Sequence, residues 1–385
     1  MMNWIEAGQA CSARWRSESG LPPPKKVVIA DDTLKADEAY RLACEGTAFL
    51  WRGDFQNARQ LLVAMSRRLD RKPRKPVLSL VEGPVLSRVE GTSALSGEAF
   101  NLHRQAQAQR ARVLATILIP LNADYVIPLR RAPEVRQACR EVYGVAGGAS
   151  VVSLRELSGL IGAHEWRKKG VEIAALDERI YPHYGVYSPV RGEYLALVNS
   201  APLPAAELAF DIGTGTGVLA ALLARRGIER VVATDQDPRA LACARENLER
   251  LGLAARVDVV QADLFPPARA PLIVCNPPWI PARPSSAIEY AIYDPDSRML
   301  RGFLDGLAAH LTPGGEGWLV ISDIAEHLGL RARAALLAWI AAAGLRVVDR
   351  MDIKPHHPKA SDDGDPLHAA RAAEITSLWR LAAVQ

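Results

Sequence analysis

An apolar segment that ends in a glycine-rich turn and continues into a helix limits the possible folds of this chain more than any other feature. Residues 208–217 read Leu-Ala-Phe-Asp-Ile-Gly-Thr-Gly-Thr-Gly, and a helical run begins at Val218. Two further apolar segments follow at strand–helix spacing, at residues 230–235 and 257–261. Strands that alternate with helices favour an α/β fold with a parallel sheet.

The glycine-rich turn has the composition of a ligand cradle. Glycine permits positive φ angles and a close approach of the backbone to a ligand, and the turn leads into a helix N-terminus. The spacing is GxGxG, which differs from the dinucleotide pattern GxGxxG, and no lysine follows as in a phosphate-binding loop. We expect a nucleotide-type ligand to contact Asp211, Gly213, Thr214, Gly215 and Gly217. The alternative is a glycine-rich turn without a ligand.

Acidic residues lie at the end of the segment 230–235 and two residues after the segment 257–261. Asp235 can accept hydrogen bonds from both hydroxyls of a ribose. Asp237 lies close by and is an alternative, although Asp237-Pro is also typical of a helix cap. Asp263 is expected to hold an adenine amino group while Leu264 packs against the ring. The alternative for Asp263 is an ordinary turn aspartate.

The tetrapeptide Asn276-Pro277-Pro278-Trp279 follows a fourth apolar run, residues 272–275. Ligands of open α/β sheets bind beyond the carboxyl ends of the strands, which is where these residues fall. Asn276 offers a carbonyl oxygen, the prolines remove backbone donors, and Trp279 offers a flat face. This combination is suited to grip a planar –NH2 group by both hydrogens. The alternative is a proline-rich turn.

An aromatic segment at residues 181–189 precedes these motifs. Tyr184 and Tyr187 are expected to form a lid over the cofactor or a wall of the substrate pocket. The alternative is a hydrophobic connector between domains.

These segments together resemble the class I S-adenosylmethionine-dependent methyltransferases that modify planar amino groups. Within them the chain is similar to the glutamine methyltransferases of release factors, and to related small-domain methyltransferases of rRNA amino groups. The likeness is carried by residues 211–217, 233–252, 259–265 and 274–281 and covers about 181–385. It departs from the glutamine methyltransferases at Trp279, where they usually have Tyr.

The resemblance implies a Rossmann-like, seven-stranded sheet whose last strand is antiparallel, and S-adenosylmethionine as the cofactor. Asn276 and the Pro277 carbonyl would each accept one hydrogen of the target amine, Pro278 completes the motif, and Trp279 would stack on the target. No metal is implied. The expected reaction is methylation of a protein glutamine amide. Two alternatives stay open, which are methylation of a guanine or adenine amino group in nucleic acid, and cofactor binding without catalysis.

The chain is long enough for two domains. We expect a mainly helical substrate-recognition domain at residues 1–180 and the methyltransferase domain at 181–385. An eight-residue sequence at 76–83 recurs at 84–91 with one difference, which predicts a poorly ordered insertion over 72–108 without a catalytic role.

Charge and composition indicate the class of partner. Residues 1–180 carry 27 Lys and Arg against 20 Asp and Glu, whereas 181–385 carry 20 against 23. A basic first half is compatible with docking on RNA or on a protein of the translation machinery, and equally with ordinary solvated surface. No apolar run reaches the roughly 18 residues of a membrane span, and no signal peptide or CxxC pair is present. We therefore expect a cytoplasmic protein without membrane, zinc or disulfide.

Overall fold

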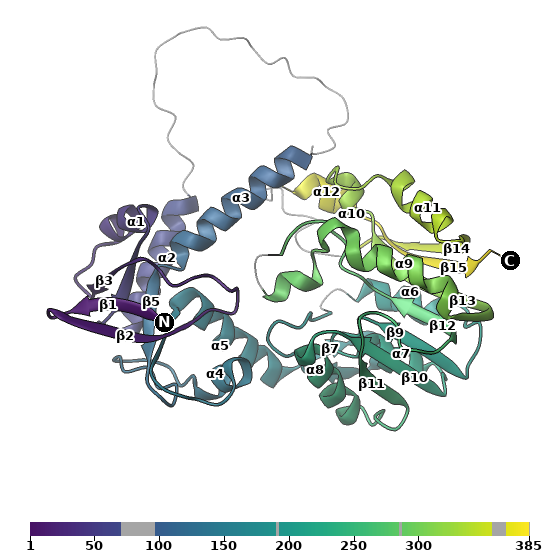
Figure 1. The fold of residues 1–385 in the computed structure, drawn as a ribbon, viewed down its shortest axis with the longest axis horizontal. Coiled ribbons are helices and arrows are strands. Elements are labelled where there is room, and N and C mark those ends of the chain that lie inside the picture. Colours follow the sequence, from purple (N-terminus) through teal and green to yellow (C-terminus); the bar gives the residue numbers. More distant parts are fainter. Residues whose placement is uncertain (71–96, 190–191, 285–286, 356–366, 385) are drawn as a thin grey trace, which may run out of the picture. The chain divides into compact units, whose positions relative to one another are not determined.

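The computed structural model describes residues 1–70, 97–189, 192–284, 287–355 and 367–384. They form two compact units. The first comprises the described parts of Met1–Ala94 and Asn101–Ile161, and the second those of Leu95–Phe100 and Gly162–Gln385 (Figure 1).

The first unit is built on a six-stranded sheet with the order β1-β2-β6-β5-β4-β3. Its strands are β1 (Met2–Glu6), β2 (Gln9–Arg16), β3 (Lys26–Ala30), β4 (Thr47–Trp51), β5 (Ile117–Leu121) and β6 (Ser150–Ser153). Its helices are α1 (Ala36–Cys44), α2 (Phe55–Asp70), α3 (Gly97–Leu114), α4 (Arg136–Tyr143) and α5 (Leu154–Lys169), of which α3 and α5 extend into the second unit.

This sheet corrects the expectation of a mainly helical first domain. The segment Thr47–Trp51 is buried at every position and forms a central strand between β3 and β5. Short, uniformly apolar runs have no periodicity that separates a buried strand from part of a buried helix. The helical spacing in the sequence belongs to the flanking α1 and α2.

The structure describes only residues 97–108 of the predicted insertion at 72–108. Residues 97–108 lie in α3, so the prediction of a poorly ordered loop is wrong for them. Residues 72–96, which hold the eight-residue repeat, lie outside the described residues.

The second unit begins before the expected boundary at residue 180. A short antiparallel pair, β7 (Val171–Ile173) and β8 (Glu178–Ile180), is part of this unit. Val171, Ile173 and Ile180 are buried in the core of the larger sheet, which explains why the division falls between Ile161 and Gly162.

The larger sheet has seven strands in the order β11-β10-β9-β12-β13-β15-β14. They are β9 (Leu208–Ile212), β10 (Arg230–Asp235), β11 (Val257–Gln261), β12 (Ala270–Cys275), β13 (Leu311–Ser322), β14 (Leu345–Ile353) and β15 (Thr376–Ala383). The pairs among β9 to β13 are parallel, and β15 is antiparallel to both β13 and β14. The predicted seven-stranded sheet with an antiparallel last strand is confirmed.

Helices cover both faces of this sheet. They are α6 (Glu193–Ser200), α7 (Val218–Arg225), α8 (Pro238–Arg250), α9 (Arg298–His310), α10 (Ile324–His327), α11 (Arg333–Ala342) and α12 (His368–Ala373). In β12, Leu272 and Val274 pack in the cluster of α6 and α7, whereas Ile273 and Cys275 pack in the cluster of α9 and α11. Alternate side chains of a strand point to opposite faces, so a strand buried on both faces is apolar throughout.

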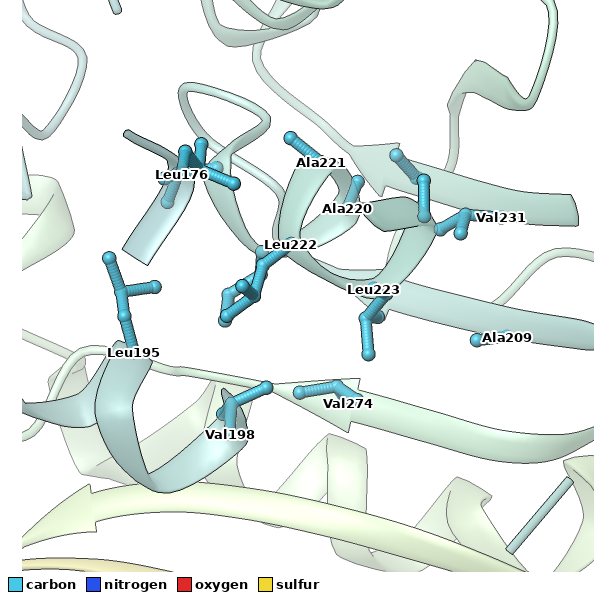
Figure 2. Close-up of a cluster of buried hydrophobic side chains, with 14 of the residues drawn as sticks. Leu176, Leu195, Val198, Ala209, Ala220, Ala221, Leu222, Leu223, Val231 and Val274 are labelled. Atoms are coloured by element: carbon cyan, nitrogen blue, oxygen red, sulfur yellow. The ribbon is translucent and has the colours of Figure 1, made fainter. Parts of the chain in front are cut away.

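Figure 2 shows the first of these clusters. Ala220, Leu222 and Leu223 of α7 lie among side chains of the strands and of α6. Seven of the eight residues of α7, from Val218 to Ala224, are buried. This packing fixes the start of α7, and with it the turn from β9. Among the described residues, no helix has both the length and the apolar character needed to cross a membrane.

Candidate functional site

The register of β9 and β12 brings two of the predicted motifs together. Cys275 is paired with Ile212, the last residues of their parallel strands. Asn276 and Gly213 therefore follow directly on two neighbouring strands, which lie about 4.8 Å apart in a sheet. The glycine-rich turn and the Asn-Pro-Pro-Trp motif thus begin side by side at the carboxyl edge of the sheet.

The three glycines of the turn all have positive φ angles, but a side chain added at each would meet different surroundings. The angles are 73° at Gly213, 55° at Gly215 and 82° at Gly217. A Cβ at Gly213 would meet the end of the Met299 side chain, and one at Gly217 would lie 3.2 Å from Cα of Ala244. A Cβ at Gly215 would meet no atom within 4 Å among the described residues. Gly217 is needed for packing because it faces the backbone of Ala244, whereas the end of the Met299 side chain beside Gly213 can move aside, and Gly215 leaves open space beside its backbone.

Asp211, the residue before the last of β9, holds the glycine-rich turn and the start of α7 through hydrogen bonds. Its Oδ2 accepts hydrogen bonds from Oγ1 of Thr214 at 2.6 Å and from the backbone N–H of Ala220 at 3.0 Å. Its Oδ1 is buried and has no hydrogen-bond partner among the described residues. Burial raises the pKa of Asp211 to about 6, although the two hydrogen bonds lower it. A buried oxygen without a partner costs free energy, so a donor from a bound molecule would be stabilised there.

Asp235 joins the turn to the next strand. Its Oδ2 accepts from the backbone N–H of Gly215 at 3.0 Å, and its Oδ1 accepts from that of Asp237 at 3.0 Å. Burial raises the pKa of Asp235, and these hydrogen bonds lower it. Asp237, the alternative, caps α8 by accepting from the N–H of Arg239 at 2.9 Å. Asp235 is therefore the one of the two acids that contacts the open part of the turn.

Asp263 and Leu264, which follow β11, have different surroundings. Asp263 is mostly exposed and forms an ion pair with Arg298 at 3.0 Å. Leu264 has a φ angle of 74°, and its carbonyl accepts from Oγ1 of Thr234 at 2.6 Å. A non-glycine residue with a positive φ angle carries about 1 to 3 kcal/mol of backbone strain, and such strained residues are found often at ligand sites. Sequence reasoning had no signal for Arg298, which lies 35 residues away from its partner in the chain.

The Asn-Pro-Pro-Trp motif is half-buried and internally bonded. Pro277 is buried, while Asn276, Pro278 and Trp279 are partly exposed. The indole Nε1–H of Trp279 donates a hydrogen bond to Oδ1 of Asn276 at 2.9 Å. The ring of Trp279 packs against three of the buried clusters of this unit.

Asp294 anchors the chain that follows this motif, and sequence reasoning missed it. Its backbone N–H donates to the carbonyl of Ile280 at 2.9 Å. Its carboxylate accepts from the N–H groups of Met299 and Leu300, at 3.0 and 3.1 Å, at the start of α9. The pair Asp294-Pro295, a typical helix-start signal, was the available clue.

The aromatic segment 181–189 is attached to α8. The N–H of Tyr181 donates to Oδ1 of Asn247 at 2.8 Å, and Nε2 of His183 lies 2.8 Å from a carboxylate oxygen of Glu246. The guanidinium of Arg239 lies 5.7 Å from the centre of the Tyr184 ring. These three contacts hold the segment against α8.

Tyr194, in α6, is the buried residue whose ionisation is affected by both Tyr187 and Asp211. Burial raises the pKa of Tyr194 well above its usual value, and the neighbouring Tyr187 and Asp211 add to this shift. Among the described residues, no group of three or more His, Cys, Asp or Glu side chains is arranged to hold a metal ion.

Comparison with known proteins points to one family. A family model described as Methyltransferase small domain matches residues 183–332. The chain is similar to the release factor glutamine methyltransferase of Cereibacter sphaeroides, with 35% identity over 169 residues that cover 40% of this chain and 58% of that protein. It therefore spans less than two thirds of that relative.

Two other relatives are matched over more of their own length. The release factor glutamine methyltransferase of Gloeobacter violaceus is 30% identical over 203 residues, which cover 48% of this chain and 67% of the relative. The tRNA1(Val) (adenine(37)-N6)-methyltransferase of Shewanella loihica is 28% identical over 183 residues, which cover 45% and 72%.

Proposed function

The chain belongs to the class I S-adenosylmethionine-dependent methyltransferases with a methyltransferase small domain, and we propose that it methylates a planar amino nitrogen, namely the side-chain amide of a protein glutamine. The observation that carries this proposal is the register that sets Asn276 beside Gly213 at the carboxyl edge of the sheet. A cofactor on the turn and a target amine at Asn276 would then be neighbours.

The residues of the turn fit S-adenosylmethionine. The open side of Gly215 admits a ligand against the backbone, and the unpartnered Oδ1 of Asp211 can accept from the cofactor's ammonium group. Asp235 adjoins the same space through its bond to Gly215, and each of its oxygens keeps a lone pair for a ribose hydroxyl. When bound, the cofactor supplies an electrophilic methyl group on a sulfonium sulfur. Leu264, held at its positive φ angle beside Thr234, is proposed to pack on the adenine.

The acceptor side is assigned to the Asn-Pro-Pro-Trp motif. Oδ1 of Asn276 and the carbonyl of Pro277 accept one hydrogen each from the target amine, which holds the nitrogen lone pair toward the methyl donor. The face of Trp279 stacks on the planar target and excludes water. Positioning of this kind is the main source of acceleration for an already reactive methyl group. The bond from nitrogen to the methyl carbon forms as the sulfur–carbon bond breaks, its electron pair stays on sulfur, and the nitrogen releases its proton to solvent when the product leaves the site.

The choice of glutamine rests on the relatives. Two of those described above are named release factor glutamine methyltransferases, so the proposed partner is a protein of the translation machinery. A specific observation also favours a second candidate, the amino group of a nucleic-acid base. The tRNA adenine methyltransferase relative is matched over 72% of its length, and a base would stack on Trp279 once it is unstacked from its strand.

Radioactive labelling distinguishes these acceptors. The full-length protein is incubated with S-adenosylmethionine that carries a tritiated methyl group and with an extract of its own organism from which its gene was deleted. Label that protease alone releases supports a protein acceptor, and mass spectrometry then checks for methylglutamine. Label that ribonuclease alone releases refutes the glutamine proposal in favour of the base. Asn276→Ala serves as the negative control, and absence of label with the wild-type protein would refute both.

A further inference from the structure

The Trp279–Asn276 contact gives the tryptophan a second task beside stacking. We propose that Trp279 is a positioning residue, whose indole N–H fixes the Asn276 amide in the orientation that accepts a hydrogen bond from the target amine. This inference rests on the proposed function, because it concerns how that same motif holds its acceptor. It is carried by the hydrogen bond of 2.9 Å from Nε1 of Trp279 to Oδ1 of Asn276.

The direction of this hydrogen bond follows from chemistry. The indole nitrogen only donates, whereas an asparagine amide can present either its oxygen, an acceptor, or its NH2 group, a donor. A rotation of the amide by half a turn would set two donors against each other. The tryptophan therefore selects the orientation in which Oδ1 faces the indole.

The same oxygen retains capacity for the target. A carbonyl oxygen has two lone pairs, and Trp279 occupies one of them. The other can accept from the amino group of a glutamine or a base. In the rotated orientation the NH2 group of Asn276 would face the target's N–H groups, and the target would not be held. The orientation of the Asn276 amide thus decides whether the site can hold the target amine.

Tryptophan can donate this hydrogen bond without using the face of its ring. Its N–H lies in the plane of the ring, so the hydrogen bond to Asn276 uses the edge of the ring and not its face. Phenylalanine has a similar face but no donor, and the hydroxyl of tyrosine lies at the far tip of its ring. The packing of Trp279 against three buried clusters keeps the ring in one place.

The hydrogen bond itself can be tested without any acceptor molecule. The chain has eight tryptophans, so the 15N-labelled full-length protein gives up to eight indole N–H signals, and Trp279→Phe identifies its own by removing it. In Asn276→Ala this signal should move upfield and exchange with water about fivefold faster, which corresponds to the loss of one hydrogen bond. Trp166→Phe, which removes an exposed indole on α5, is the matched control and should leave the Trp279 signal unchanged. An unmoved Trp279 signal in Asn276→Ala would overturn the proposal.

The catalytic consequence is measured with purified release factor from the same organism. Trp279→Phe keeps an aromatic face and should lower kcat about fivefold, with KM for the release factor changed by less than about twofold. Trp279→Leu removes the face as well and should also raise KM. A kcat of Trp279→Phe equal to that of the wild type would overturn the positioning role. If the wild type does not methylate release factor, the glutamine proposal fails, whereas the indole signal still decides the positioning proposal.

Discussion

Replacement of Asp211 by Asn should change how the stability of the ligand-free protein depends on pH. Burial raises the pKa of this carboxyl from its ordinary 3.8 to about 6 in the folded state. Between these two values the folded protein binds more protons than the unfolded chain, so the stability contributed by this group falls as pH rises. Above about pH 6 the full penalty is reached, on the order of 3 kcal/mol, or about two pKa units at 1.36 kcal/mol each.

The asparagine variant removes this penalty because it has nearly the same shape and does not ionise. About half of the penalty, roughly 1.5 kcal/mol, develops between pH 5 and pH 8. For a domain of about 200 residues this corresponds to about 3 to 6 °C in Tm. From pH 5 to pH 8, the Tm of the wild type should therefore fall by that amount relative to the Tm of Asp211→Asn.

Thermal unfolding followed by circular dichroism at the two pH values measures this difference. Groups that titrate in both proteins and lie far from Asp211 cancel when the two Tm changes are subtracted. Asp258→Asn, at an exposed carboxyl paired with Arg230, is the matched control and should follow the wild type. Equal pH dependence in the wild type and Asp211→Asn would refute the reasoning, because it would mean that Asp211 is not held at a raised pKa.

Three further substitutions test the site. Asn276→Ala should abolish methyl transfer while the dissociation constant of S-adenosylmethionine, measured by calorimetry, stays close to that of the wild type; unchanged turnover would contradict the assignment of the acceptor site. Asp235→Ala should weaken cofactor binding at least about tenfold through the loss of the ribose contacts, whereas Asp258→Ala should not, and a wild-type affinity would remove the ribose role. Gly215→Ala should lose about 1 to 2 kcal/mol of stability because of its positive φ angle, with no added clash since its Cβ meets open space, and it should block the cofactor. Gly217→Ala should be destabilised further by contact with the backbone of α8. Tight cofactor binding by Gly215→Ala would show that the cradle lies elsewhere.

The second unit could be predicted from the sequence because each of its local signals agrees with the fold. The glycine-rich turn, the acid at the end of β10 and the tetrapeptide after β12 each mark the carboxyl end of a buried strand. Parallel strands share that edge, so the sequence order alone predicted that Gly213, Asp235 and Asn276 gather there.

The contacts within the site could not be predicted in this way. The hydrogen bond from Trp279 to Asn276 depends on the rotamers of two neighbouring side chains. The anchor at Asp294 and the ion pair of Arg298 with Asp263 join residues through the tertiary structure. Patterns of residue type carry no information about such pairs.

The first unit was misjudged for a different reason. Thr47–Trp51 is a strand buried on both faces, with neither the alternation of a half-exposed strand nor the spacing of a helix. It stands between two amphipathic helices, so the helical pattern on either side appeared continuous.

The pairing of β9 with β12 also bears on how such an enzyme acquires new targets. Both strands are buried on their two faces, and a shift of one residue between them would exchange every apolar side chain from one face to the other. The spacing between methyl donor and acceptor motif is thus locked by the interior of the protein and is insensitive to its surface. Exchange of the peripheral segments can therefore retarget the enzyme while the transfer geometry is inherited unchanged.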